Sequence, residues 1–120
     1  MAIKTTLNYS LNFNSIKRKS KEIKFLIFHY TGMKNELDAI NRLTEIQSEV
    51  SSHYLIKSDG EILTLVPDLY IAWHAGRSYW KTYSSLNKNS IGIEISNPGH
   101  QFRYRSFSKK QINSLLKLSK

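Results

Sequence analysis

The sequence predicts an α/β fold in which a central mixed β-sheet is flanked by helices. Three observations predict it: an apolar run at residues 24–31, apolar residues at helical spacing over residues 35–50, and two β-rich segments around an Asp-Gly turn within residues 52–66. In chain order these are a strand, a helix and a β-hairpin. A loop, a strand and a helix follow, and this order is typical of a mixed sheet with helices packed on it.

Composition limits the chain to one domain without cysteine chemistry. Its 120 residues, 40% of them hydrophobic, provide for a single core. The sequence has no run of about 18 apolar residues and a polar N-terminus, so we expect no transmembrane helix or secretory signal and predict a cytoplasmic location. Without cysteine, a metal must be held by imidazole and carboxylate. The net charge of +9 favours polyanions, but its densest patch, residues 17–21, is expected to be a solvated surface.

The first two segments are a polar arm and a strand that ends in reactive side chains. Residues 1–22 alternate polar and apolar residues over a short span, which predicts an edge strand or an arm lying on the body. The apolar run from Lys24 to Thr31 predicts a central strand covered on both faces. Such strands place catalytic groups at their carboxyl ends, where His29 and Tyr30 lie. His29 is either a reactive residue or a hydrogen-bonded core histidine.

A helix and a hairpin come next. Apolar residues recur every three or four positions, at Leu37, Ile40, Leu43, Ile46 and Val50. This spacing predicts an amphipathic helix over residues 35–50, with Asn35 as its N-cap. Residues 52–57 and 61–66 then predict the two arms of the hairpin, joined by Asp59-Gly60.

A long aromatic loop and a second buried strand follow the hairpin. Residues 69–88 form a loop of a length that is usually functional in so small a domain. Over residues 89–96, isoleucines alternate with Gly92, Glu94 and Ser96, which predicts a strand with one apolar face. Taken alone, Glu94 is either a solvent-facing carboxylate or part of a site.

The last segment predicts a helix that is cut short. Ser108 and Gln111 form a capping box, and Ile112, Leu115 and Leu116 follow at helical spacing. The chain stops at residue 120 without a C-terminal helix signal, so we expect it to be truncated. A basic loop that holds His100, Arg103 and Arg105 precedes this helix.

Four motifs in order resemble one family. They are Phe28-His29-Tyr30-Thr31, Ser51-Ser52-His53-Tyr54, Ala72-Trp73-His74-Ala75-Gly76 and Ser90-Ile91-Gly92-Ile93-Glu94. Together they resemble the zinc-dependent N-acetylmuramoyl-L-alanine amidases, relatives of peptidoglycan recognition proteins and of phage T7 lysozyme. The resemblance covers about residues 23–98. It implies an N-terminal arm at residues 1–22 and an amidase-like domain at residues 23–120.

The resemblance assigns roles to individual residues. It makes His29 a zinc ligand and Glu94 the catalytic carboxylate. Residues expected around the substrate are Tyr30, His53, Trp73, His74, Ala75, Gly76, Asn87 and Asn97. Core packing is the alternative for Trp73, and a hydrogen bond that supports the site is the alternative for His53.

The implied activity is hydrolysis of the amide between N-acetylmuramic or anhydro-muramic acid and L-alanine, in bacterial peptidoglycan or in muropeptides from its recycling. The family's two other zinc ligands and a lysine come from a segment that has no match in the sequence. That segment is therefore a possible separate partner, and the 120-residue chain by itself is expected to have little or no activity. A non-catalytic peptidoglycan-binding module is the alternative. A specific nucleic-acid partner is not expected, because the aromatic residues are not interleaved with arginine in a known motif.

Overall fold

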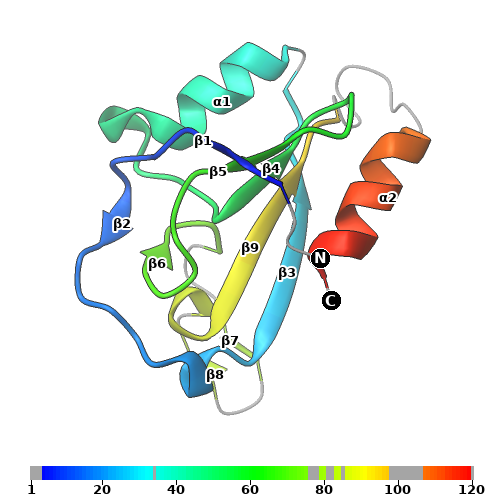
Figure 1. Cartoon of the computed structure of the whole chain (residues 1–120). Coiled ribbons are helices and arrows are strands. Elements are labelled where there is room, and N and C mark those ends of the chain that lie inside the picture. Colours follow the sequence, from blue (N-terminus) through cyan, green and yellow to red (C-terminus); the bar gives the residue numbers. More distant parts are fainter. Residues whose placement is uncertain are drawn as a thin grey trace.

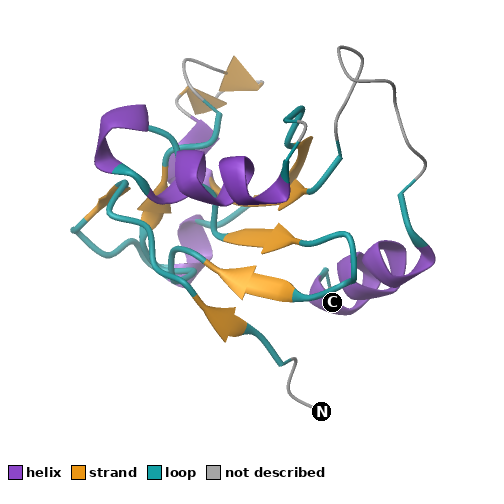
Figure 2. Cartoon of the chain, turned by 90° about the horizontal axis from the view of Figure 1, so that it is seen from above, coloured by secondary structure: helices purple, strands orange, loops and turns teal. Residues whose placement is uncertain are grey.

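The computed structural model describes residues 4–33, 35–75, 79–80, 83–84, 86–97 and 107–119. In these residues a five-stranded mixed sheet lies between two helices, so the predicted α/β fold is confirmed (Figures 1 and 2). The strands, in spatial order, are β1 (Thr6–Leu7), β5 (Ile62–Thr64), β4 (Tyr54–Ile56), β9 (Ser90–Ile95) and β3 (Phe25–Tyr30). The helices α1 (Glu36–Thr44) and α2 (Lys109–Leu118) cover opposite faces.

Strand β9 lies in the interior of the sheet, and its alternation confirms the predicted strand. It pairs in parallel with β3 on one side and with β4 on the other. The face towards α2 is an apolar core, which consists of Ile56, Ile62, Ile91, Ile93 and Ile95, with Leu115 and Leu118 of α2 packed against it. The face towards α1 has a second core, Leu43, Leu55, Leu63 and Leu65, and also carries the polar residues of β9. Strand β9 thus carries core residues on one face and candidate site residues on the other.

The prediction that residues 24–31 form a central strand is wrong. Within the described residues β3 pairs only with β9 and lies at the edge of the sheet (Figure 1). Leu26, Phe28 and Tyr30 are 44%, 49% and 46% exposed. The interior positions belong to β5, β4 and β9, which have hydrogen-bonding partners on both sides, whereas β3 alternates between half-buried and exposed residues.

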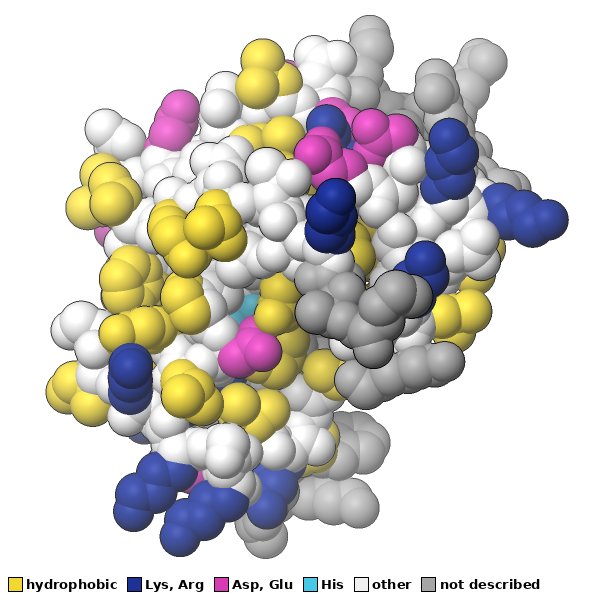
Figure 3. All heavy atoms as spheres, viewed as in Figure 1, with side chains coloured by type: hydrophobic (Ala, Val, Ile, Leu, Met, Phe, Trp, Pro, Cys, Tyr) yellow, Lys and Arg dark blue, Asp and Glu magenta, His cyan; other side chains and the backbone are white. Residues whose placement is uncertain are grey.

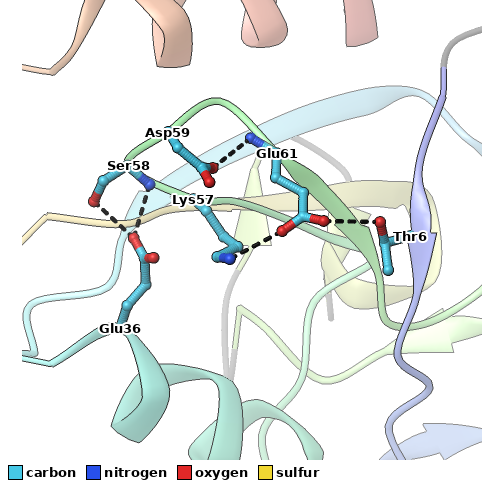
Figure 4. A network of polar contacts seen from close by, with 6 residues as sticks. All are labelled: Thr6, Glu36, Lys57, Ser58, Asp59 and Glu61. Atoms are coloured by element: carbon cyan, nitrogen blue, oxygen red, sulfur yellow. Dashed lines mark hydrogen bonds and ion pairs between the residues drawn. The ribbon is translucent and has the colours of Figure 1, made fainter.

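The predicted hairpin is confirmed, with shorter arms. Strands β4 and β5 pair antiparallel, with Ile56 opposite Ile62. Gly60 in the turn has a φ of 90°, a conformation that side chains other than glycine rarely adopt. A polar network fixes the turn to its surroundings (Figure 4). In it, Glu36 of α1 accepts hydrogen bonds from both the amide and the hydroxyl of Ser58, at 2.7 Å each.

Helix α1 is shorter than predicted. α1 ends at Thr44, so its predicted extension to residue 50 is wrong, and Leu37 and Ile46 are exposed. The chain turns away through a 3-10 turn, η2 (Ile46–Ser48), because the Ser48 hydroxyl bonds the Glu45 carbonyl at 2.7 Å and competes with the helical pattern.

The capping residues of the helices were predicted with mixed success. Asn35 is the N-cap residue of α1 but makes no side-chain cap bond. In α2 the capping box is confirmed. The Ser108 hydroxyl accepts from the Gln111 main-chain amide at 3.1 Å, and the Ser108 main-chain amide donates to the side-chain oxygen of Gln111 at 3.0 Å. Of the apolar residues predicted to pack, Leu115 contacts the core, whereas Ile112 is 47% exposed.

The N-terminal arm is bound to the sheet through its polar residues. β1 pairs in parallel with β5, and β2 (Phe13–Asn14) pairs antiparallel with β6 (Ile71–Ala72). Ser10 and Asn12 face inward and are buried, while the Asn12 amide donates to the carbonyls of residues 45 and 50 at 2.8 Å each. The alternating apolar residues of the arm, Leu7, Tyr9 and Leu11, are exposed instead.

The basic patch is a solvated surface with one exception. The lysines at positions 17, 19 and 21 are exposed, and basic side chains gather around η1 (Ser20–Glu22) at the lower end of the view (Figure 3). Arg18 is buried and donates to the carbonyls of Asp68, Asn87 and Lys88 at 2.9, 3.0 and 3.1 Å. It therefore joins the arm to two later loops.

Residues 69–88 are more regular than the predicted loop. They contain β6, β7 (Tyr79–Trp80), β8 (Tyr83–Ser84) and the start of η3 (Leu86–Asn89). The basic loop with His100, Arg103 and Arg105 lies outside the described residues. None of the helices in the described ranges has the length and apolar character needed to cross a membrane.

Candidate functional site

A pocket opens between α1 and the polar face of β9. Its volume is about 160 Å³, room for about five water molecules. Four of its lining side chains could bind a ligand or take part in catalysis: Arg42 from α1, Trp73 and His74 from the loop after β6, and Glu94 from β9. The pocket thus contains three of the predicted site residues.

Glu94 is the acidic group of the pocket. Its Oε2 atom is buried and has no hydrogen-bond partner among the described residues. Burial raises the pKa of Glu94 to about 7, and the charge of Arg42 opposes part of that rise. A carboxyl group with a pKa near neutrality can both take up and release a proton, as a general base and acid must.

His29 lies beside Glu94 on the neighbouring strand. The two residues are direct partners in the parallel register of β3 and β9, so their side chains share the face towards α1. The imidazole is half-buried, and burial lowers the pKa of His29. A neutral imidazole is the form that binds a metal ion.

His74 packs directly on the backbone of β9. A Cβ atom built on Gly92 would lie 2.5 Å from Cγ of His74, so this position excludes a side chain as long as the ring stays there. The ring Nδ1 is 3.4 Å from Nε2 of His29. Burial lowers the pKa of His74 to about 3, and the nearby His53 and His29 lower it further. His74 is therefore neutral.

The loop that carries His74 is held by Asn87. The side-chain oxygen of Asn87 accepts hydrogen bonds from the amides of His74, at 3.1 Å, and of Ala75, at 2.8 Å. Ala75 is half-buried beside the pocket residues, and Gly76 lies outside the described residues. Asn87 thus positions the loop, and its contact with substrate stays a prediction.

Trp73 is attached to both the arm and the hairpin entry. Its indole N–H donates to Oδ1 of Asn14 at 2.7 Å, and its amide donates to the Ser51 hydroxyl at 2.9 Å. The side chain is partly buried and lines the pocket. The sequence raised two alternatives for Trp73, core packing and a place beside the substrate. Its position is compatible with both.

His53 has the surroundings of a supporting residue. It is 0% exposed, accepts from the Gly92 amide at Nδ1 over 3.0 Å, and donates from Nε2 to the Tyr70 carbonyl over 2.8 Å. Burial lowers its pKa to about 4. Because both ring nitrogens are engaged, the geometry favours the hydrogen-bonding role over the predicted contact with substrate, which no observation tests.

Two further predicted residues lie away from the pocket. Tyr30 alternates with His29 along β3 and therefore lies on the opposite face of the sheet. Asn97 is buried, and its main chain bonds Thr31 and Gly32 just after β3. The structure does not bring these two side chains together with Glu94.

The described residues provide one side chain suited to bind zinc. His29 fits the role of one ligand, because burial lowers the pKa of its imidazole and favours the form that binds a metal ion, and because it lies beside Glu94 in the sheet. Within the described residues, however, no group of three histidine, cysteine, aspartate or glutamate side chains could hold a metal ion. Catalytic zinc needs three protein ligands, so the described part of the chain fits one ligand and not a complete zinc site.

Sequence reasoning missed two residues of the site. Arg42 lines the pocket, and the signal was available, since it follows the buried Ala39 by three residues on the same helix face. Ser90 bonds His74 at 3.0 Å. Its place opposite the isoleucines of β9 was predictable, but its partner on a distant loop was not.

Fold and site together define an α/β protein in which two paired parallel strands carry a partly buried carboxyl group and a histidine, with a second histidine on a neighbouring loop. The sequence profile of the N-acetylmuramoyl-L-alanine amidase family matches residues 19–120. The chain therefore belongs to this family.

Individual relatives agree with this assignment. N-acetylmuramoyl-L-alanine amidase AmiD of Escherichia coli (strain K12) is 38% identical over an alignment of 110 residues, and the match covers 82% of this chain and 39% of AmiD. The crystal structure of AmpDH3 from Pseudomonas aeruginosa in complex with anhydromuramic pentapeptide has a TM-score of 0.74 at 30% identity, over 91% of this chain and 49% of that one.

A third comparison is the E. coli AmiD structure with the substrate anhydro-N-acetylmuramic acid-L-Ala-D-γ-Glu-L-Lys. It has a TM-score of 0.71 at 35% identity and covers 84% of this chain and 44% of that one. The present chain thus spans less than half the length of these relatives.

Proposed function

We propose that this chain carries the substrate pocket and the general base of an N-acetylmuramoyl-L-alanine amidase. The bond cleaved is the amide between N-acetylmuramic or anhydro-muramic acid and L-alanine. The observation that carries the proposal is Glu94, a partly buried carboxyl group with a pKa of about 7 in the pocket of a chain that belongs to the amidase family. The anhydromuramic peptides bound to AmpDH3 and AmiD support the class of substrate.

The pocket residues have distinct parts in this proposal. Glu94 takes a proton from the attacking water and returns it to the nitrogen of the leaving L-alanyl peptide, so that water is added across the amide bond. Arg42 supplies a positive charge on the opposite wall, suited to a carboxylate of the peptide. Trp73 offers an apolar surface to the sugar or the peptide.

Zinc is the cofactor we propose, with His29 as one of its ligands. When bound, zinc lowers the pKa of its water and polarises a carbonyl group. Because the described residues provide one candidate ligand, we expect the 120-residue chain by itself to bind the substrate but to cleave it slowly or not at all.

The test uses the anhydro-muramoyl tripeptide seen with AmiD. Binding is measured by calorimetry, and release of the L-alanyl peptide by chromatography, with and without added zinc or chelator. We expect binding in both the wild-type chain and Glu94→Gln, and any cleavage to fall about 10²- to 10⁴-fold in the variant. Absence of binding would contradict the substrate pocket. Fast cleavage that a chelator does not affect would contradict the role of zinc.

A second candidate function is a non-catalytic peptidoglycan-binding module. The absence of a three-ligand group within the described residues favours it. Metal analysis of the purified chain distinguishes the two. One tightly held zinc ion per chain would exclude the binding module, whereas sedimentation with insoluble peptidoglycan, without zinc and without peptide release, would support it.

We also propose a cytoplasmic location, with soluble anhydro-muropeptides as the natural substrate. The support is the anhydro sugar in the ligands of both solved relatives. Cell fractionation tests the location. Comparing intact peptidoglycan with the soluble tripeptide in the same release assay tests the substrate, and a preference for intact wall would contradict the proposal.

A further inference from the structure

A chain of hydrogen bonds leads from a backbone carbonyl to His29. The Ser90 hydroxyl is 2.7 Å from the carbonyl oxygen of Leu86 and 3.0 Å from Nε2 of His74. On the other side of the same ring, Nδ1 of His74 is 3.4 Å from Nε2 of His29. Two side chains thus connect His29 to the main chain of η3.

The first hydrogen bond of this series determines which atom donates and which accepts in each of the others. A carbonyl oxygen only accepts, so Ser90 donates its one hydrogen to Leu86. The Ser90 oxygen then accepts from Nε2–H of His74. A neutral imidazole has one N–H, which leaves Nδ1 of His74 as an acceptor.

The same reasoning extends to the second histidine. Because Nδ1 of His74 can only accept, Nε2 of His29 must be the donor across the 3.4 Å contact. A neutral imidazole carries one N–H, so the proton of His29 then lies on Nε2. A neutral His29 with its proton on Nε2 has a free lone pair at Nδ1.

The ring of His74 has little freedom to leave this position. Gly92 lies beneath it, and its missing side chain is what leaves room for the ring. From the loop side, Asn87 fixes the main chain of His74 and of the residue after it. Ser90 itself is 0% exposed. The series of hydrogen bonds from Leu86 through Ser90 and His74 to His29 is called the relay below. Its central ring, that of His74, is thus restrained by β9 on one side and by Asn87 on the other.

We propose that Ser90 and His74 are positioning residues, which hold His29 in the Nε2–H tautomer and leave its Nδ1 as the atom offered to a ligand. Fixing the tautomer of a ligating histidine through its other nitrogen is how a neighbouring group orients it and sets its basicity. The tautomer does not depend on enzymatic activity. Only its use in an amidase site rests on the proposed function.

The experiment is NMR spectroscopy of the metal-free 120-residue chain. Histidine is labelled with ¹⁵N in the ring, a chelator is present, and two-bond ¹H–¹⁵N correlations are recorded at a pH where the histidines are neutral. His29→Asn identifies the resonances of His29 by their loss. We expect Nε2 of His29 at the shift of a protonated nitrogen and Nδ1 at that of an unprotonated one. The opposite tautomer in the wild-type chain would overturn the proposal.

A pair of serine variants tests the relay itself. Ser90→Ala removes the acceptor of His74, so the Nδ1 and Nε2 shifts of His29 should move towards an average of the two tautomers. Ser52→Ala is the matched control, because Ser52 is equally buried but bonds the carbonyl of Tyr54 and not a histidine. We expect the control to leave the His29 pattern unchanged. An unchanged tautomer in Ser90→Ala would overturn the role of the relay.

The readout separates this inference from the proposed function. Muropeptide binding and release can fail while the tautomer of His29 is as predicted, and this would reject the amidase alone. A wrong tautomer together with muropeptide cleavage would reject the relay alone. If Ser90→Ala does not fold, the spectrum of the wild-type chain still decides the tautomer.

Discussion

The two faces of β9 have opposite effects on the stability of the domain. Ile91, Ile93 and Ile95 are buried under α2 and contribute apolar contacts. On the other face, Gly92 leaves room for the ring of His74, and Glu94 has a buried oxygen without a hydrogen-bond partner among the described residues. The alternation of one strand therefore separates residues that stabilise the fold from residues that form a site, where the buried oxygen of Glu94 reduces stability.

The largest effect should come from the apolar face. Ile93 is 1% exposed, and Ile93→Ala should lower the free energy of unfolding by about 2 to 5 kcal/mol, because it removes buried methyl groups and leaves a cavity. Chemical denaturation followed by circular dichroism measures the loss.

The conservative variant Ile93→Val serves as the control, with an expected loss of about 0.5 to 1.5 kcal/mol. The ratio of the two losses tests whether the site is tightly packed. If Ile93→Ala were as stable as the wild-type chain, the isoleucine face would not be the core that the structure describes.

Glu94, the residue after Ile93, should lower the free energy of unfolding instead of raising it. The pKa of Glu94 is raised from 4.5 to about 7, so the folded state binds this proton more tightly than the unfolded chain does. The associated stability is fully present below pH 4.5 and is lost as the pH rises through 7. The loss amounts to about 3 kcal/mol at alkaline pH.

Glu94→Gln removes this titration. We therefore expect the variant to be more stable than the wild-type chain at pH 8 and to lose that advantage towards pH 4. The measurement is the difference between the two unfolding free energies as a function of pH, in which the other titrating groups cancel. A difference that does not change with pH would show that Glu94 is solvated in the folded chain.

The sequence predicted the alternation of β9 because isoleucines two residues apart are a local pattern. The Asp59-Gly60 turn and the Ser108 capping box were predicted for the same reason, since each depends on the backbone chemistry of a few adjacent residues. The family resemblance then directed attention to Glu94, whose position in a pocket no local pattern could reveal.

The errors of prediction concern contacts between distant segments. α1 ends early because Asn12 of the arm and Ser48 both donate to the Glu45 carbonyl, which a longer helix would use. The edge position of β3 depends on which strands pair with β9, and hydrophobicity alone does not determine that. The bond from Ser90 to His74 joins a strand to a loop 16 residues earlier, and no pattern within either segment indicates it.

The smallest of the three effects concerns the glycine of the polar face. In Gly92→Ala the new methyl group would lie 2.5 Å from Cγ of His74 and 2.6 Å from its Cδ2, so the ring must move. We expect a loss of about 1 to 3 kcal/mol in unfolding free energy, as for other overpacked sites.

A double-mutant cycle with His74→Ala identifies the cause of that loss. Without the ring, the three closest contacts of the methyl group are removed, so Gly92→Ala should cost much less in the His74→Ala background, with a coupling energy of about 0.5 to 3 kcal/mol. Equal losses in both backgrounds would mean that something other than His74 excludes a side chain at residue 92. Strong coupling would instead show that the polar face of β9 lacks a side chain there in order to hold the imidazole, which is the reverse of the arrangement on the isoleucine face.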